Sequence, residues 1–244
     1  MDGSPCEDAA GWAISRDGTS AVLAVADGVG SAARSDVGAR IAVDLFIDQA
    51  RSSAPCSVPE IRDLVVSVRE RWMQELRPSS EQSRLTDFNT TFICATTTRW
   101  GVLVATIGDC FSVLMRQSAV GPRYFLSTVQ DRPRRDGGMN LTHTWLSDNW
   151  LDHLHCVEFV DPSICGVLLA SDGLEDVAIR SAWHEGEQAE LRPVGVQLGV
   201  VDQFLEGTRR GYVSSGSELA EAVRSTDLIM DAKGDDIGVA LSVW

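Results

Sequence analysis

The most constraining feature of this sequence is a run of apolar residues that ends in an aspartate beside a glycine. Residues 21–26 (AVLAVA) lead directly into Asp27 and Gly28. A short apolar run closed by turn residues is typical of a strand that is buried on both faces. Gly28 permits a sharp turn and a close backbone approach, so Asp27 is expected to be a carboxylate fixed at the end of a rigid strand. A single Asp-Gly pair most often only makes a turn, so the recurrence of the pattern decides its meaning.

The pattern recurs further along the chain, and a reversed copy opens the last predicted strand. If these strand ends meet in space, several carboxylates share one small volume. Like charges so close together cannot all ionise unless cations compensate them. Oxygen ligands without His or Cys suit Mg or Mn, with Ca as an alternative. The candidate metal-binding residues are Asp8, Asp27, Asp109, Asp172 and Asp235, with Glu7 beside Asp8.

Composition narrows the classes of partner and location. The 244 residues suffice for one large domain or two small ones, and we expect a single domain over residues 1–244. The net charge of −14 disfavours nucleic acid and anionic membranes as partners. No apolar run approaches the roughly 18 residues of a membrane span, and the first residues lack the features of a secretory signal. The six cysteines form no Cys-x-x-Cys pair, which favours reduced core residues of a cytoplasmic protein.

Apolar periodicity predicts strands that are grouped together and helices that come in separate pairs. Ser35 is expected to cap a helix that runs to about Ser52, and Pro59 to lie in the first turn of a helix ending near Arg77. This grouping indicates a sandwich of sheets flanked by helices rather than alternating strands and helices. The predicted strands are residues 9–15, 20–26, 89–98, 102–107, 110–115, 123–128, 156–160, 166–171 and 237–243.

The segment between Gly173 and the last strand is predicted to be mainly helical. An apolar stripe at helical spacing supports one helix, and Leu219 and Val223 mark a shorter one. The stripe consists of Val194, Leu198, Val201, Phe204 and Leu205.

Taken together and in order, these motifs resemble the PP2C-type metal-dependent protein serine/threonine phosphatases of the PPM family, in their short bacterial form. The resemblance extends from Glu7 to Val243, and each motif alone is weak. It implies an α+β fold with four layers, α-β-β-α, in which two antiparallel sheets are flanked by helix pairs. The matching stretches are Glu7–Ala9, Val25–Ser31, Asn89–Thr91, Ile107–Cys110, Leu169–Leu174 and Gly234–Ile237.

The resemblance also implies two core Mg or Mn ions and a third, weaker one. Asp27 would bridge the core ions, and the carbonyl of Gly28 would hold one of them. Asp172 and Asp235 would complete the protein ligands of the second ion, and Asp109 would hold the third ion together with Asp172. Asp8 would act through water, with Asp27 and Asp8 as the catalytic residues. A water between the ions would attack phosphoserine or phosphothreonine in a protein substrate, so no cysteine nucleophile is needed.

Three departures from the family pattern qualify the resemblance. Val29 stands where some relatives carry a histidine that could protonate the leaving group. Gly3 and Ser4 occupy the region where the family often has a phosphate-binding arginine. The last motif is Asp235-Asp236 where the family usually has Asp-Asn, and the ligand is assigned to Asp235.

Two alternative functions remain open at this point. The first is a regulatory or binding domain that keeps the fold without efficient catalysis, which the missing arginine and histidine favour. The second is a hydrolase of small phosphate esters. For the phosphatase itself, the expected partner is a phosphorylated protein, such as the product of a Ser/Thr kinase. Metal-dependent turnover and a comparison of phosphopeptides with phosphorylated metabolites separate the three possibilities.

Overall fold

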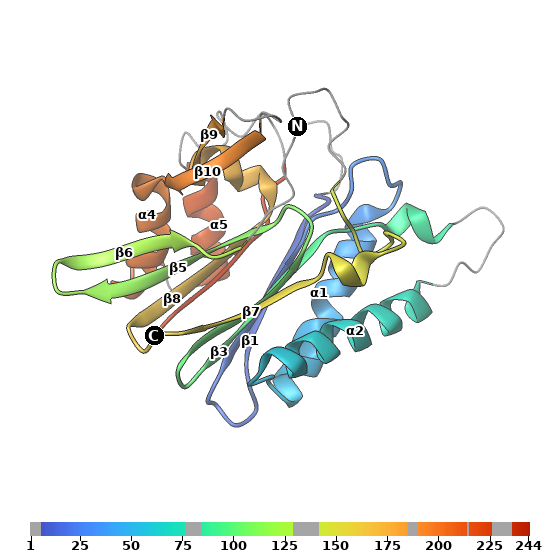
Figure 1. The fold of residues 1–244 in the computed structure, drawn as a ribbon, viewed down its shortest axis with the longest axis horizontal. Coiled ribbons are helices and arrows are strands. Elements are labelled where there is room, and N and C mark those ends of the chain that lie inside the picture. The colour runs from blue at the N-terminus through green and yellow to red at the C-terminus, as the bar shows by residue number, and fades with distance from the viewer. Residues whose placement is uncertain (1–5, 77–83, 129–141, 185–189, 214, 226–235) are drawn as a thin grey trace.

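Two antiparallel sheets lie face to face, and helices cover the outer face of each (Figure 1). The computed structural model describes residues 6–76, 84–128, 142–184, 190–213, 215–225 and 236–244. The four layers follow the order helix, sheet, sheet, helix. The α+β sandwich expected from the sequence is therefore confirmed.

The first sheet has the strand order β1-β2-β3-β4-β7, and each neighbouring pair is antiparallel. The β1–β2 hairpin turns at residues 15–20, where Gly18 has a φ of 73°, as the Asp-Gly signal predicts. The second sheet has the order β11-β8-β5-β6. The strands of the first sheet are β1 (Ala9–Ile14), β2 (Ala21–Ala26), β3 (Phe92–Thr98), β4 (Gly101–Ile107) and β7 (His155–Val160). Those of the second are β5 (Phe111–Ser118), β6 (Gly121–Leu126), β8 (Ile164–Ala170) and β11 (Val239–Val243).

Two long helices, α1 (Ser35–Ser52) and α2 (Val58–Glu75), cover the first sheet. The indole of Trp72 is fully buried and donates a hydrogen bond to the Gly38 carbonyl at 2.8 Å, which ties the two helices together. Ser57 caps α2 by accepting from the Glu60 amide, and Pro59 lies in the first turn as predicted. Ser35 does not cap α1, because it is the first helical residue and is itself buried.

The second sheet is covered by α4 (Leu198–Arg209) and α5 (Gly216–Ser225). Between the sheets lies an apolar layer of small and branched side chains, which includes Leu23, Val25 and Ile93 from the first sheet. Leu114 and Leu169 come from the second. Because both faces of the central strands are covered, their sequences are continuous runs of apolar residues and do not alternate between apolar and polar residues.

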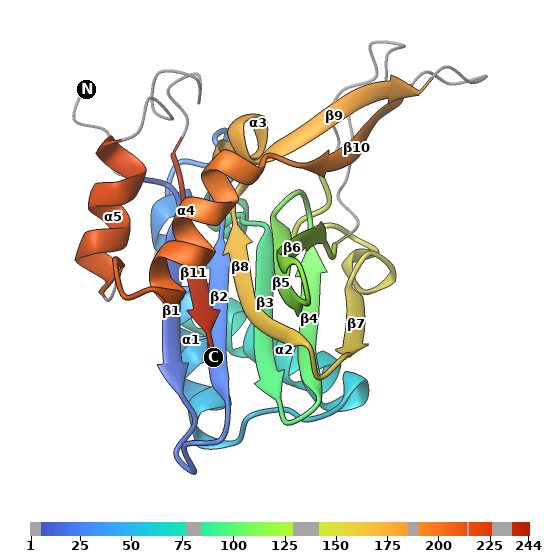
Figure 2. The ribbon, with the colours of Figure 1, turned by 90° about the vertical axis from the view of Figure 1, so that its left-hand side faces the viewer.

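The prediction of helical structure after Gly173 is wrong for residues 179–184 and 190–196. These residues form a β-hairpin of β9 (Ile179–His184) and β10 (Glu190–Val196) that projects beyond the sandwich (Figure 2). Val194 therefore belongs to a strand, although Val201 and Phe204 lie on α4 as expected. Two residues of the strand, Pro193 and Gly195, are poor helix formers, and the register of the hairpin shifts between them.

The remaining elements are short. In the described parts of the chain, no helix is both long enough and apolar enough to span a membrane. The short helices are η1 (Leu85–Phe88), η2 (Trp150–Asp152), η3 (Asp172–Leu174) and α3 (Glu175–Ala178).

Candidate metal centre and active site

Asp27 follows the last residue of β2, and its main chain is fixed to the start of β3. The Asp27 carbonyl accepts hydrogen bonds from the Thr91 amide at 2.9 Å and from the Thr90 hydroxyl at 2.7 Å. Gly28 forms an isolated bridge with Thr90. A Cβ on Gly28 would lie 2.6 Å from the Glu7 carbonyl oxygen, so only glycine fits here. The turn is thus rigid on both sides of the carboxylate.

Asp109 follows β4 through Gly108, whose φ is +101°. A Cβ on Gly108 would lie 2.6 Å from the Thr91 Cβ, so the position requires glycine for both its conformation and its packing. The hydroxyl of Thr142 donates a hydrogen bond to Asp109 Oδ2 at 2.7 Å. The sequence motifs give no indication of Thr142, because it lies 33 positions further along the chain in an irregular segment.

Asp172 is the first residue of η3, directly after β8 and Ser171. The Ser171 amide donates to the Gly238 carbonyl at 3.0 Å, and the Gly238 amide donates to the Ser171 hydroxyl at 2.8 Å. A Cβ on Gly173 would lie 1.9 Å from the Asp236 carbonyl oxygen. These contacts hold the chain just before β11 against the end of β8.

The N-terminal acidic pair joins the same region from the other sheet. The Glu7 amide donates to Asp236 Oδ2 at 2.6 Å, so Asp236 has a structural partner that the sequence did not reveal. Asp8 lies beside Asp27 and Ser171. Its Oδ2 is buried and accepts no hydrogen bond from the residues that the structure describes. Asp235, to which a metal ligand was assigned, lies outside the described residues.

The three carboxylates at the strand ends meet in one place. One oxygen from each of Asp27, Asp109 and Asp172 lies within 4.8 Å of the other two. They come from β2 and β4 of the first sheet and from β8 of the second. This oxygen-only set of half-buried carboxylates fits a hard divalent cation such as Mg or Mn.

The electrostatics of the cluster support the same interpretation. Burial raises the pKa of Asp27 to about 11, and the charge of Asp8 is the next largest cause. Asp172 and Asp109 act in the same direction. Burial also raises the pKa of Asp8. Because each carboxylate opposes the ionisation of the others, the cluster holds protons at neutral pH unless cations take their place.

Two other residues close to the predicted motifs have structural roles. Cys110 is fully buried, its sulfur lies 3.2 Å from the Thr91 hydroxyl, and burial raises the pKa of the thiol well above its ordinary value. It is therefore a core residue and not a thiolate nucleophile. The guanidinium of Arg34 stacks over the Phe88 ring, 4.8 Å from its centroid, which gives this residue a packing contact.

The interpretation of the cysteines as core residues is only partly right. All six lie in the described part of the chain, and none of them forms a disulfide there. Cys94 and Cys110 are buried and Cys156 and Cys165 are half-buried, whereas the remaining two, at positions 6 and 56, are exposed. The two exposed cysteines lie outside helices and strands, where apolar periodicity carries no information.

Solved structures of bacterial phosphatases have the same fold. The serine/threonine phosphatase of S. agalactiae has a TM-score of 0.66 and 14% identity, with 100% of this chain and 96% of that chain covered. The catalytic domain of the phosphatase PstP, in complex with two manganese ions, has a TM-score of 0.59 and 15% identity, with 100% and 94% covered. Stp1 from Staphylococcus aureus has a TM-score of 0.59 and 14% identity, with 98% and 88% covered.

The sequence comparison leads to the same family. No curated protein sequence matches this chain. The family model for protein phosphatase 2C, however, matches residues 1–204, a range that includes Asp8, Asp27, Asp109 and Asp172. The chain therefore belongs to the protein phosphatase 2C family of metal-dependent protein phosphatases.

Proposed function

We propose that this chain hydrolyses phosphoserine and phosphothreonine in proteins at a centre of Mg or Mn ions held by aspartates. The observation that carries the proposal is the meeting of Asp27, Asp109 and Asp172 within 4.8 Å, in a chain of the protein phosphatase 2C family. When bound, such ions supply an activated water and neutralise charge on the phosphoryl oxygens.

The proposal gives each carboxylate a role. Asp27 would hold both core ions, with the Gly28 carbonyl on one of them and Asp172 and Asp235 on the other. Asp109 would join Asp172 at a third, weaker ion. The position of Asp27 supports its central role, because one of its oxygens lies within 4.8 Å of oxygens of Asp109 and Asp172, and the charge of Asp8 also raises its pKa. Asp8 would act through water, and its buried Oδ2 is available to accept a hydrogen bond.

The proposed partner is a phosphorylated protein, such as the product of a Ser/Thr kinase. The net charge of −14 repels anionic substrates at a distance, so the phosphoryl group must be drawn in locally by the metal ions. The same charge disfavours nucleic acid and anionic membranes. A cytoplasmic location stays a prediction, which the absence of disulfides among the six cysteines supports.

The test is phosphatase turnover with and without divalent metal. We expect hydrolysis of p-nitrophenyl phosphate and of phosphoserine peptides to stop in excess EDTA and to return with added Mn. Asp27→Asn should lower turnover about a thousandfold, as does the loss of a major electrostatic stabiliser. The matched control is Asp44→Asn, which removes one negative charge from the exposed face of α1 and should leave turnover unchanged.

Calorimetry with Mn separates the core ions from the third one. Asp109→Asn should keep the tight sites of the parent, whereas Asp27→Asn should lose them. The reverse result would overturn the assignment of these two residues. Activity that survives exhaustive chelation would overturn the metal mechanism. Metal binding without turnover on any phosphoester would indicate a regulatory domain, and a preference for phosphorylated metabolites over phosphopeptides would indicate a small-ester hydrolase.

A further inference from the structure

The side chain of Asp236 joins the segment before β11 to the segment before β1. Its carboxylate accepts the hydrogen bond from the Glu7 amide at 2.6 Å, and bonds from a main-chain amide to a charged acceptor are typically short. The main chain of Asp236 is fixed as well, because a Cβ on Gly173 would lie 1.9 Å from its carbonyl oxygen. Asp236 thus connects the end of β8 with the residues that lead into β1.

The main chain of Glu7 is held at both its amide and its carbonyl. The amide donates to Asp236, and the carbonyl oxygen lies against Gly28, where an added Cβ would approach it to 2.6 Å. Because successive side chains of an extended segment take their directions from the main chain, the position of Glu7 sets the direction of the Asp8 side chain. Asp8 lies beside Asp27. Its placement at the candidate metal centre therefore depends on the contact between Glu7 and Asp236.

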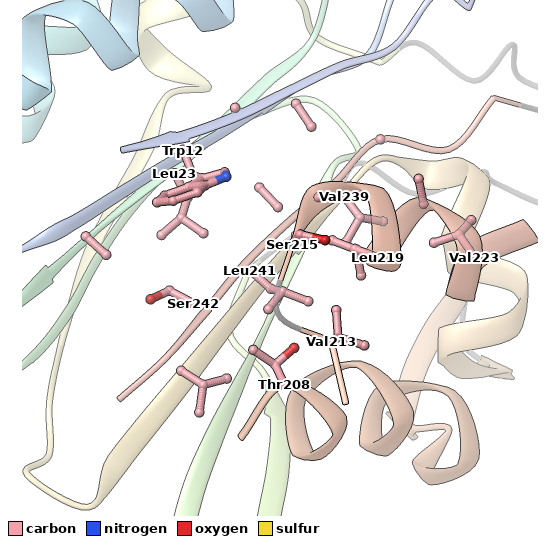
Figure 3. A pocket seen from close by; sticks show the side chains of 18 of the residues that line it. Trp12, Leu23, Thr208, Val213, Ser215, Leu219, Val223, Val239, Leu241 and Ser242 are labelled. Atoms are coloured by element: carbon pink, nitrogen blue, oxygen red, sulfur yellow. The ribbon is translucent and has the colours of Figure 1, made fainter. Parts of the chain in front are cut away.

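Side-chain packing leaves Asp8 room to move. In the described part of the chain, a pocket of about 700 Å³ lies between β1, β11 and α5, with Trp12 and Leu241 beside it (Figure 3). Asp8 and Gly238 are among the residues that line this pocket. On this side of Asp8 the hydrogen bond at Glu7 is therefore needed to fix its position.

The acceptor oxygen of Asp236, and not its charge, favours this arrangement. Burial is the largest cause of the raised pKa of Asp8, and the charge of Asp236 adds to it. The two carboxylates thus oppose each other when both are ionised. A carboxamide oxygen at position 236 could accept the same hydrogen bond without this repulsion.

We propose that Asp236 is a positioning residue of the metal centre, which holds Asp8 beside Asp27 through the Glu7 amide and does not itself bind the ions. This role rests on the proposed function, in which Asp8 acts on the ions through water. Groups that orient the surroundings of a metal ion typically change its affinity by about 10- to 100-fold. Loss of the acceptor should therefore weaken metal binding although no ligand is removed.

Three variants of the full chain test the role of the acceptor. Asp236→Ala removes the acceptor, whereas Asp236→Asn keeps an acceptor oxygen and removes the charge. The matched control is Asp161→Ala. Asp161 also accepts a main-chain amide, that of Ser163 at 2.8 Å, but it precedes β8, at the end of the strand opposite to Asp172. Circular dichroism checks that all three variants fold.

The measurements are Mn binding by calorimetry and exchange of the Glu7 amide by NMR in EDTA. Asp236→Ala should lower the affinity for Mn about tenfold, and should speed exchange of the Glu7 amide by about tenfold or more. Asp236→Asn should keep both at the values of the parent. Asp161→Ala should also leave both unchanged, because its hydrogen bonds are remote from the carboxylate cluster.

A double-mutant cycle shows whether Asp236 acts through Asp8. Asp8→Ala should itself weaken Mn binding. In that background Asp236→Ala should lower the affinity no further, because the side chain that it positions is already missing. An independent role would instead give two losses that add.

Three outcomes would overturn the proposal. If Asp236→Asn weakens Mn binding as much as Asp236→Ala does, the charge or direct ligation is responsible. If the losses of Asp8→Ala and Asp236→Ala add, Asp236 does not act through Asp8. If Asp236→Ala changes neither Mn affinity nor exchange of the Glu7 amide, the contact positions nothing.

The proposed function can fail separately from this role. A parent that binds Mn but hydrolyses no phosphoester would contradict the phosphatase activity, and the affinities and the cycle would still decide the role of Asp236. A parent that binds no Mn would overturn both, since there would be no metal centre for Asp236 to support.

Discussion

Replacement of Asp27 by asparagine should make the metal-free protein more stable and the metal-bound protein less stable. Asp27 lies among carboxylates that oppose its ionisation, and its pKa is raised from an ordinary value of 3.8 to about 11, first by burial and then by the charge of Asp8. An asparagine at this position keeps the shape of the side chain and removes the charge. The same charge is what attracts divalent cations, so one substitution has opposite effects in the two states.

The sign of the pH dependence follows from proton binding. Between about pH 4 and about pH 11 the folded state binds the Asp27 proton and the unfolded state has lost it. Stability therefore decreases as pH rises through this window, by about 1.4 kcal/mol per pH unit for one proton. From about pH 5 to about pH 8, Asp27 contributes a loss of up to about 4 kcal/mol in the free energy of unfolding. Asp27→Asn should remove this slope.

The assay is urea denaturation, followed by circular dichroism at about pH 5 and about pH 8, in EDTA and in excess Mn. In EDTA at the higher pH the variant should be the more stable protein. Mn at about ten thousand times its dissociation constant for the parent should stabilise the parent by about 5.5 kcal/mol, which exceeds the loss of about 4 kcal/mol, and should stabilise the variant, which loses the tight sites, by much less, so the order reverses. The control Asp44→Asn should keep the slope of the parent. A variant with the slope of the parent, or one less stable than the parent in EDTA at high pH, would refute the reasoning.

Three further predictions concern residues around the site. Gly108→Ala should lower the free energy of unfolding in urea by about 3 kcal/mol, because φ is +101° and a Cβ would collide with a threonine side chain. Gly18→Ala, where φ is +73° and the space is open, should lower it by about 1 kcal/mol, and equal losses would contradict this account. Cys110→Ser should keep most of the turnover, and a collapse of activity in a folded variant would indicate thiol chemistry. Thr142→Val removes the hydrogen bond to Asp109 and should destabilise the metal-free protein by about 1.5 kcal/mol in urea denaturation. Unchanged stability would show that this hydrogen bond does not contribute to the free energy of unfolding.

The local sequence pattern predicted the secondary structure correctly wherever the buried residues of a segment repeat at a regular spacing. The runs before Asp27 and Asp172 are strands because both of their faces are covered, and α1 and α2 end within two residues of their predicted bounds, since their apolar stripes repeat at helical spacing. The local sequence pattern failed at residues 179–184 and 190–196, which are strands. There the spacing of Val194 and Leu198 matched a helix, although the two residues lie on different elements.

Several strands can be predicted from the amino-acid order to end in carboxylates beside glycines, because apolar runs and turn residues are local features. Which of these strand ends meet depends on how the layers pack. The pairing of Asp27 with Asp109 and Asp172 depends on the packing of two sheets, and Glu7 and Asp236 make contact across 229 positions of the chain. The raised pKa of Asp27 arises from the same packing. Burial and proximity are properties of the assembled layers, and no periodicity along the chain specifies them.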